Sequence, residues 1–204
     1  MELYKYKNYD EYVKAQIEGN VRKIRNSYVD PISLNVLINQ LYEEYNIKPK
    51  TIICHGTRRG LEQQYFLESY TTIGLSPNII GTEISHTAND YPNTIQWDFH
   101  NVKDEWVNSI DLIYSNSFDH SYNPNQCLKS WMSCLSDNGV CVLEYSYECD
   151  TKCGKTDPFA ATLDEYKEFI SKDYVIEDIL SSEGLDDRGE THKGTRYFIL
   201  IKNK

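Results

Sequence analysis

The chain has 204 residues, a length that suits one domain with a full hydrophobic core. Its 21 basic and 31 acidic residues give a formal net charge of −10, which disfavours nonspecific binding to nucleic acids and to anionic membranes. No stretch approaches the roughly 18 apolar residues of a membrane span, so we expect a soluble, cytoplasmic protein whose six cysteines are reduced and hold no zinc.

Residues 1–48 are predicted to form a helical N-terminal cap. Apolar residues at helical spacing run over residues 9–26, and Gly19 and Asn20 are expected to interrupt or end this helix. A second helix is predicted to begin at Pro31 with Asp30 as its N-cap, because Pro suits the first helical position and Asp accepts from the unpaired N–H groups there.

Residues 49–204 alternate between strand and helix patterns. The predicted strands are Thr51–Cys54, Ile79–Ile84, Thr94–Trp97, Asp111–Ser115, Val140–Tyr145, Tyr174–Leu180 and Arg196–Lys202. The predicted helices are Gly60–Tyr70, Val102–Asn108, Pro124–Leu135 and Leu163–Ser171, with a turn at Asp137–Gly139. Apolar strands that alternate with helices indicate a Rossmann-like, doubly wound α/β domain with a mostly parallel seven-stranded sheet. The last two strands are expected to form an antiparallel hairpin around the loop Ser182–Gly194.

The run from Thr51 to Gly60 predicts a binding site. A strand leads into a Gly-containing turn and then a helix, whose first N–H groups lack partners and can hold a nucleotide-like ligand. Glu83 ends the next predicted strand, where an acidic residue can accept hydrogen bonds from the two hydroxyls of a ribose.

Five segments follow one another in a characteristic order: Gly56–Gly60, Gly81–Ser85, Trp97–Asn101, Asp111–His120 and Asp137–Glu144. Together they resemble class I S-adenosylmethionine-dependent methyltransferases over roughly Thr51–Glu144 and the terminal hairpin. A narrower likeness, in residues 16–24, 54–58, 114–122 and 157–159, is to small glycan-associated methyltransferases of bacteria, phages and large algal viruses. The resemblance implies S-adenosyl-L-methionine as cofactor and S-adenosyl-L-homocysteine as product.

The resemblance also implies a cofactor site built from several strand ends. The methionine part would lie against His55, Gly56, Thr57 and Gly60, and the sulfonium would lie near Ser115 and Asn116. The ribose would bind to Glu83, beside Ile84. The adenine would bind to Asp98 and to Phe99 or Trp97. This chain departs from the family pattern in two places. Cys54 stands where an acidic residue is common, which leaves the cofactor's α-amino group without its usual partner. Arg58 replaces the middle glycine, and either pairs with the cofactor's carboxylate or is a solvated charge at the helix start.

Methyl transfer to a hydroxyl requires a group that removes the proton. Asp119 and His120, directly after the fourth strand, are the candidates for this role. Asp119 is our first choice as the direct base; alternatively it orients His120, or it forms a turn and caps the next helix. We also assign Phe118, Tyr122, Tyr147 and Asp157 to acceptor binding.

The predicted function is an O-methyltransferase acting on a sugar hydroxyl in glycan modification. The alternatives are methylation of another small metabolite or of a nucleic-acid base, and a non-catalytic cofactor-binding scaffold domain. No metal is assigned, although His55, Asp98, His100, Asp119 and His120 offer ligands for a divalent ion. Arg22, Lys23 and Arg25 form either a lid or a solvated helix face. The sequence leaves the oligomeric state open.

Overall fold

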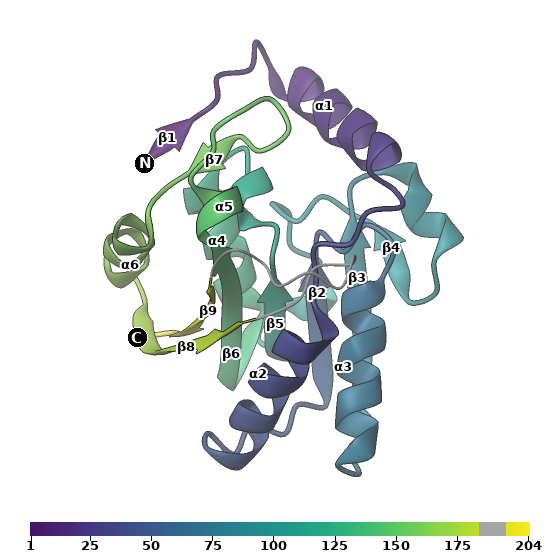
Figure 1. Cartoon of the computed structure of the whole chain (residues 1–204), viewed down its shortest axis with the longest axis vertical. Coiled ribbons are helices and arrows are strands. Elements are labelled where there is room, and N and C mark those ends of the chain that lie inside the picture. Colours follow the sequence, from purple (N-terminus) through teal and green to yellow (C-terminus); the bar gives the residue numbers. More distant parts are fainter. Residues whose placement is uncertain (184–194) are drawn as a thin grey trace.

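The computed structural model describes residues 1–183 and 195–204. Its centre is a seven-stranded sheet in the order β4-β3-β2-β5-β6-β9-β8 (Figure 1). The strands are β2 Thr51–His55, β3 Asn78–Glu83, β4 Thr94–Gln96, β5 Ile110–Ser115, β6 Leu135–Ser146, β8 Val175–Ser182 and β9 Arg196–Lys202. Strands β2 to β6 pair in parallel, and β9 is antiparallel to both β6 and β8. The predicted Rossmann-like sheet and its C-terminal hairpin are therefore confirmed; residues 184–194 of the connecting loop lie outside the described part.

Helices cover both faces of this sheet. Helices α2 (Pro31–Glu43) and α3 (Leu61–Thr72) pack on one face, and α4 (Pro124–Cys134) and α6 (Leu163–Ser171) pack on the other (Figure 1). Successive strand residues alternate between the two apolar cores: Ile52 packs beneath α2 and α3, whereas Ile53 packs toward α4. The near-continuous apolar strands are thus explained by burial on both sides.

The starts of two helices follow from their capping residues. The Asp30 carboxylate accepts the N–H groups of Ile32 at 3.3 Å and Ser33 at 2.7 Å, which confirms it as the N-cap of α2. Thr162 and Glu165 form a capping box at the start of α6, where the two residues satisfy each other's backbone N–H groups.

Helix α1 (Tyr9–Arg22) lies across the end of the sheet where β3 and β4 finish (Figure 1). The expected interruption at Gly19 and Asn20 is wrong, because the helix continues through both residues. Gly19 lets the helix pack closely: a Cβ at this position would lie 3.0 Å from Thr156 Cγ2. The Asn20 side chain is held by the Thr87 hydroxyl at 2.9 Å. Both residues therefore serve packing rather than helix termination.

Several short elements were not predicted. Strand β1 (Glu2–Leu3) pairs with β7 (Phe159–Ala160) in a separate two-stranded sheet, and α5 (Tyr147–Asp150) follows β6. The region expected to be a helix at Val102–Asn108 contains only the 3-10 turn η2, Asp104–Trp106. The predicted turn Asp137–Gly139 lies inside β6, at a register irregularity against β5. Elements of two to five residues carry too little periodicity to be recognised in a sequence.

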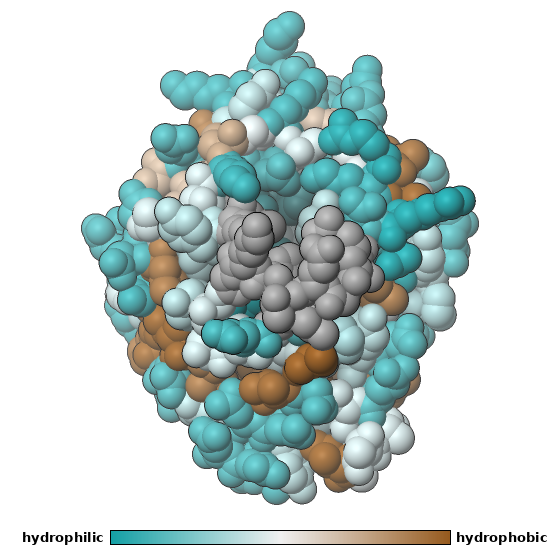
Figure 2. Space-filling view, in the orientation of Figure 1, coloured by the Kyte–Doolittle hydropathy of each residue, from teal (hydrophilic) through white to brown (hydrophobic). Residues whose placement is uncertain are grey.

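The surface is mainly hydrophilic in the orientation of Figure 2, with apolar side chains in small separate groups. In the part of the chain that the structure describes, no helix has the length and apolar character needed to cross a membrane. Five cysteines have described side chains, and all five are unpaired: Cys54, Cys127, Cys134, Cys141 and Cys153.

Candidate active site

Two adjoining cavities lie at the edge of the sheet where the parallel strands end. The larger cavity, of about 250 Å³, is enclosed by the β2–α3 turn, the loop after β5 and the segment between α1 and α2. The smaller cavity, of about 50 Å³, lies beneath α1 and against the ends of β3 and β4. Five residues line both cavities: Lys23, Gly56, Arg58, Ser117 and His120. The strand order reverses between β2 and β5, which is where open α/β sheets bind ligands.

The turn after β2 brings the backbone close to two neighbouring strand ends. Gly56 has a φ of +73°, and a Cβ there would lie 2.6 Å from the Cβ of Ser117 in the loop after β5. Its N–H donates to the Thr82 carbonyl at 2.9 Å. Arg58 also has a positive φ, +48°, and its N–H donates to the Glu83 carboxylate at 3.2 Å. Only glycine fits at position 56.

Glu83 presents a carboxylate at the end of β3, as predicted. The residue is 7 % exposed, lines the smaller cavity, and accepts the N–H groups of Arg58 and Ser85, the latter at 2.9 Å. Burial raises the pKa of Glu83, and the hydrogen bond from Ser85 opposes that rise. Ile84 follows it along the same cavity wall.

Asp98 has one carboxylate oxygen that is unsatisfied. Its Oδ1 accepts the His100 N–H at 3.0 Å and lies 2.7 Å from His100 Nδ1, whereas Oδ2 is buried without a partner. Asp98 and Phe99 both line the smaller cavity. Trp97 does not line it; its ring packs against Trp106, and its Nε1 donates to a backbone carbonyl. Between the two predicted aromatic candidates, Phe99 is the residue at the cavity.

Helix α1 forms the roof of the smaller cavity through Tyr12, Gln16, Gly19 and Asn20. The Gln16 amide donates to the Thr156 carbonyl at 3.1 Å, and its oxygen lies 2.9 Å from His120 Nδ1. Of the three basic residues considered as a lid, Lys23 lines both cavities, whereas Arg22 and Arg25 are exposed and line neither.

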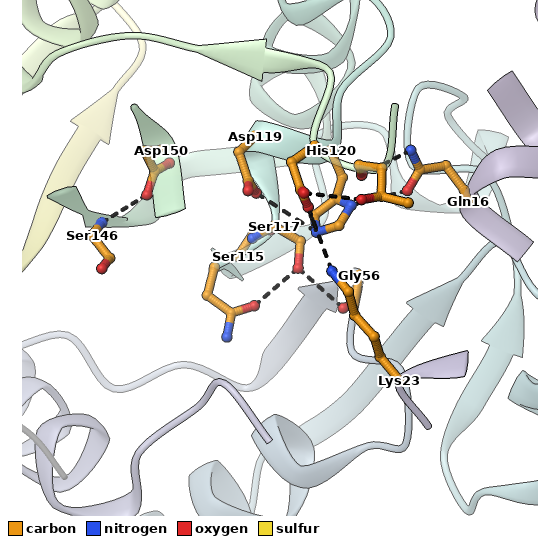
Figure 3. Close-up of polar contacts among 12 residues, drawn as sticks. Gln16, Lys23, Gly56, Ser115, Ser117, Asp119, His120, Ser146 and Asp150 are labelled. Atoms are coloured by element: carbon orange, nitrogen blue, oxygen red, sulfur yellow. Dashed lines mark hydrogen bonds and ion pairs between the residues drawn. The ribbon is translucent and has the colours of Figure 1, made fainter. Parts of the chain in front are cut away.

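Asp119 and His120 lie in the 3-10 turn η3 (Phe118–His120), directly after β5. Figure 3 shows His120 between Gln16 and Asp119, and the Lys23 side chain extends toward this group from below. His120 Nε2 lies 3.9 Å from an Asp119 carboxylate oxygen and 3.5 Å from one of Asp157. Lys23 Nζ lies 3.9 Å from the same Asp157 oxygen. These four side chains form a charged cluster at the junction of the two cavities.

Burial shifts the pKa values of two members of this cluster, Asp119 and His120. Burial and the nearby Asp157 carboxylate raise the pKa of Asp119 to about 7, although Lys23 opposes the rise. Burial lowers the pKa of His120 despite the opposing effect of Asp157, so the imidazole favours its neutral form. Because the Gln16 oxygen can only accept, Nδ1 carries the proton and Nε2 keeps a free lone pair. A proton acceptor therefore stands where the cavities meet.

Asp119, His120 and Asp157 could also hold a metal ion. Their ligand atoms all lie within 4.8 Å of one another. Lys23 places a positive charge beside Asp157, which weakens the attraction for a cation. The other predicted metal candidates are elsewhere: His100 bonds to Asp98 and Ser121, and His55 is buried in an aromatic cluster.

Four predicted site residues support the cavities without lining them: His55, Gly60, Ser115 and Phe118. His55 is 3 % exposed and stacks on Trp131 with ring centroids 4.6 Å apart, and burial lowers its pKa to about 3. Ser115 donates to the His55 carbonyl at 3.0 Å. Phe118 packs in the aromatic core, and Gly60 caps α3 with a φ of +79°.

Two predicted acceptor residues, Tyr122 and Tyr147, are likewise not at the cavities. Tyr122 packs against Tyr6, Tyr9 and Tyr12, and Tyr147 is 67 % exposed. The predicted residues that do line a cavity are Gly56, Thr57, Arg58, Glu83, Ile84, Asp98, Phe99, Asn116, Asp119, His120 and Asp157.

The structure adds cavity residues that sequence analysis did not assign. They are Tyr12, Gln16, Gly19, Asn20, Asn26, Ser27, Tyr28, Val29, Arg59, Leu61, Glu62, Ser117, Lys152 and Thr156. Gln16, Gly19 and Asn20 lie at i, i+3 and i+4, so they share one face of α1. That spacing was the available signal for the roof. Glu62, in the first turn of α3, gave no such signal, because acidic residues are common there as helix-start charges.

Neither a protein-family model nor a curated protein matches the sequence. Solved structures do match. A Burkholderia thailandensis 1,6-didemethyltoxoflavin-N1-methyltransferase, with its substrate and S-adenosylhomocysteine bound, has 12 % identity and a TM-score of 0.69 over 98 % of this chain and 92 % of that one. An S-adenosylmethionine-dependent methyltransferase of Anabaena variabilis has 13 % identity and a TM-score of 0.63 over 100 % and 99 %.

The plantazolicin methyltransferase in complex with S-adenosylhomocysteine is similar over 96 % of each chain, with 15 % identity and a TM-score of 0.63. These likenesses extend over nearly the whole chain, so they concern the complete fold rather than one motif. The chain has the class I fold of S-adenosylmethionine-dependent methyltransferases.

Proposed function

We propose that this chain with a class I methyltransferase fold is an S-adenosylmethionine-dependent methyltransferase. The observation that carries the proposal is the pair of carboxylates that line the smaller cavity, the buried Glu83 and the partly buried Asp98. They stand at the ends of successive strands, and Asp98 Oδ2 lacks a partner. A buried, unsatisfied acceptor is costly, and a ligand that donates a hydrogen bond removes that cost.

An adenosine group matches this cavity chemically. Asp98 Oδ2 would accept from its exocyclic amine, Phe99 and Ile84 would contact its ring, and Glu83 would accept from its ribose hydroxyls. Only together do the two cavities, of about 250 and 50 Å³, reach the lower end of the volume range for small-molecule sites, roughly 300 Å³.

The larger cavity would take the methionine part and the acceptor. When bound, S-adenosylmethionine supplies an electrophilic methyl group, which the acceptor oxygen takes as the carbon–sulfur bond breaks and its electron pair stays on sulfur. His120 Nε2 lies at the junction of the cavities and would remove the hydroxyl proton. Asp119 and Asp157, at 3.9 and 3.5 Å, would stabilise the resulting imidazolium. Asp119 as the direct base is the alternative, supported by its raised pKa of about 7.

We propose a sugar hydroxyl as the acceptor, with the chain acting in glycan modification. The support is the polar lining of the larger cavity, where Asn26, Asn116, Lys152 and Asp157 can bond to several hydroxyls, beside the ring of Tyr28. The narrower sequence resemblance supports the same class. A nitrogen acceptor is the second candidate, because the Burkholderia thailandensis neighbour is an N1-methyltransferase and Asp119 or His120 can equally take a proton from nitrogen.

Release of S-adenosylhomocysteine should be measured over a panel of monosaccharides, glycosides and nitrogen heterocycles, with and without EDTA. The proposal predicts turnover on a sugar that EDTA does not change. Turnover only on heterocycles would overturn the sugar assignment and keep the methyltransferase. Loss of turnover with EDTA would place a metal on Asp119, His120 and Asp157. Tight cofactor binding without turnover on any acceptor would favour a non-catalytic scaffold.

A further inference from the structure

Glu62 is a buried carboxylate for which the fold supplies too few partners. It lies in the first turn of α3, is 6 % exposed, and lines the larger cavity. The Asn116 amide donates to its Oε1 at 3.4 Å, whereas Oε2 is buried without a hydrogen-bond partner. Burial raises the pKa of Glu62 to about 7, and the Arg58 charge opposes that rise. A ligand that brings a cationic donor would satisfy this oxygen.

Glu62 lies beside the turn after β2, which would hold the methionine part of the proposed cofactor. Gly56 and Thr57 line the same cavity. Asn116 reaches Glu62 from the loop after β5. Two strand ends and the start of α3 thus converge on one polar corner.

The end of β2 and the turn that follows it, residues 54–60, contain no carboxylate. Cys54, at the position where an acidic residue is common in this fold, is fully buried in the apolar core beneath α3. Burial raises the pKa of its thiol well above the usual value, and the charge of Glu62 adds to the rise. Cys54 is therefore a neutral core residue, and it lies close enough to Glu62 for the carboxylate charge to affect the pKa of its thiol.

Arg58 supplies the opposite charge at the same cavity. Its guanidinium lies over the Tyr28 ring at 4.9 Å, and Nη1 donates to the Asn26 carbonyl at 3.1 Å, which fixes the group at the cavity wall. Four guanidinium N–H groups remain for an anion. A carboxylate and a guanidinium on one cavity wall suit a zwitterion.

We infer, on the basis of the proposed function, that Glu62 receives the α-ammonium group of the cofactor's methionine part while Arg58 receives its carboxylate. The acidic partner of the α-ammonium group would thus lie in the first turn of α3, instead of at the end of β2. Asn116 donates to Oε1, which leaves Oε2 as the oxygen without a hydrogen-bond partner.

The test compares two ligands that differ only in the amino-acid part attached to the sulfur. S-adenosylhomocysteine carries the amino-acid group, and 5′-methylthioadenosine lacks it. Glu62→Gln is expected to weaken binding of S-adenosylhomocysteine at least about tenfold in calorimetry, and to leave methylthioadenosine unchanged within about twofold. Glu62→Asp, which keeps the charge on a shorter arm, should fall between wild type and Glu62→Gln. Glu68→Gln on the exposed face of α3 is the matched control and should change neither affinity.

Three results would overturn the inference. Unchanged affinity of Glu62→Gln for S-adenosylhomocysteine would remove the ammonium contact. An equal loss for both ligands would make Glu62 a structural residue, and thermal melting of the variants would show that loss of stability. Failure of the wild-type chain to bind either ligand would refute the proposed function itself, and the role of Glu62 with it.

Discussion

Asp98→Asn tests the adenine end of the proposed cofactor site. The carbonyl oxygen of the new amide would keep the hydrogen bond from the His100 N–H, now 3.0 Å long, because that donor needs an acceptor. The amide NH₂ would then replace the unpartnered Oδ2 and point a donor at the adenine amine. Losing a hydrogen bond to a charged group costs about 1.5–3 kcal/mol, which corresponds to about ten- to hundredfold weaker binding of S-adenosylhomocysteine.

Asp98→Asn should also reverse the preference of the site for an amine over a carbonyl oxygen on the base of the ligand. S-inosylhomocysteine has a carbonyl oxygen where adenine has its amine, so it should bind the wild type weakly and Asp98→Asn more tightly. Calorimetric titration of both ligands into both proteins measures this exchange, and Asp90→Asn, at an exposed position of the 3-10 turn after β3, is the control. The reasoning is refuted if both ligands lose the same affinity, or if neither affinity changes.

Three further predictions concern the turn and the base. Gly56→Ala should abolish binding of S-adenosylhomocysteine, because its Cβ would lie 2.6 Å from a neighbouring side chain; Gly74→Ala shares the positive φ, at +81°, but has open space and should retain binding. His120→Ala and Asp119→Asn should each lower kcat by about 10²–10⁴-fold while ligand affinity is retained. The control His86→Ala, at an exposed position, should leave kcat unchanged. If both variants have the kcat of the wild type, neither residue is the base. Burial raises the pKa of Asp119 in the folded chain to about 7. As the pH rises, the unfolded chain therefore loses the Asp119 proton at a lower pH than the folded chain does, so the free energy of unfolding falls between about pH 4 and pH 7. Asp119→Asn should therefore melt at least about 2 °C above wild type at pH 8, with the gap closing toward pH 4, and a constant gap would contradict the shift.

The sheet was predictable because its strands are buried on both faces and alternate with amphipathic helices. Glu83 and Asp98 were predictable for the same reason: a polar residue directly after such a strand must lie at the carboxyl edge, where the parallel strands all end. Asp30 was predictable from capping chemistry alone. In each case the deciding interaction is local, or follows from the sheet.

The roof and the inner wall of the site depend on contacts between distant segments. Gly19 looks like a helix break until Thr156, over a hundred positions away, packs against it. His55 and Cys54 end the same strand, yet alternation sends them to opposite faces, His55 onto Trp131 and Cys54 beneath α3. Glu62 reads as an ordinary helix-start charge until its burial is known.

Calorimetric titration of the wild-type chain with S-adenosylhomocysteine tests the central claim most directly. The proposed function predicts saturable binding of one ligand per chain, lost in Gly56→Ala and weakened in both Asp98→Asn and Glu62→Gln. A folded chain that gives no binding heat at any temperature tested, and no change in melting temperature with excess ligand, would contradict the proposed cofactor site.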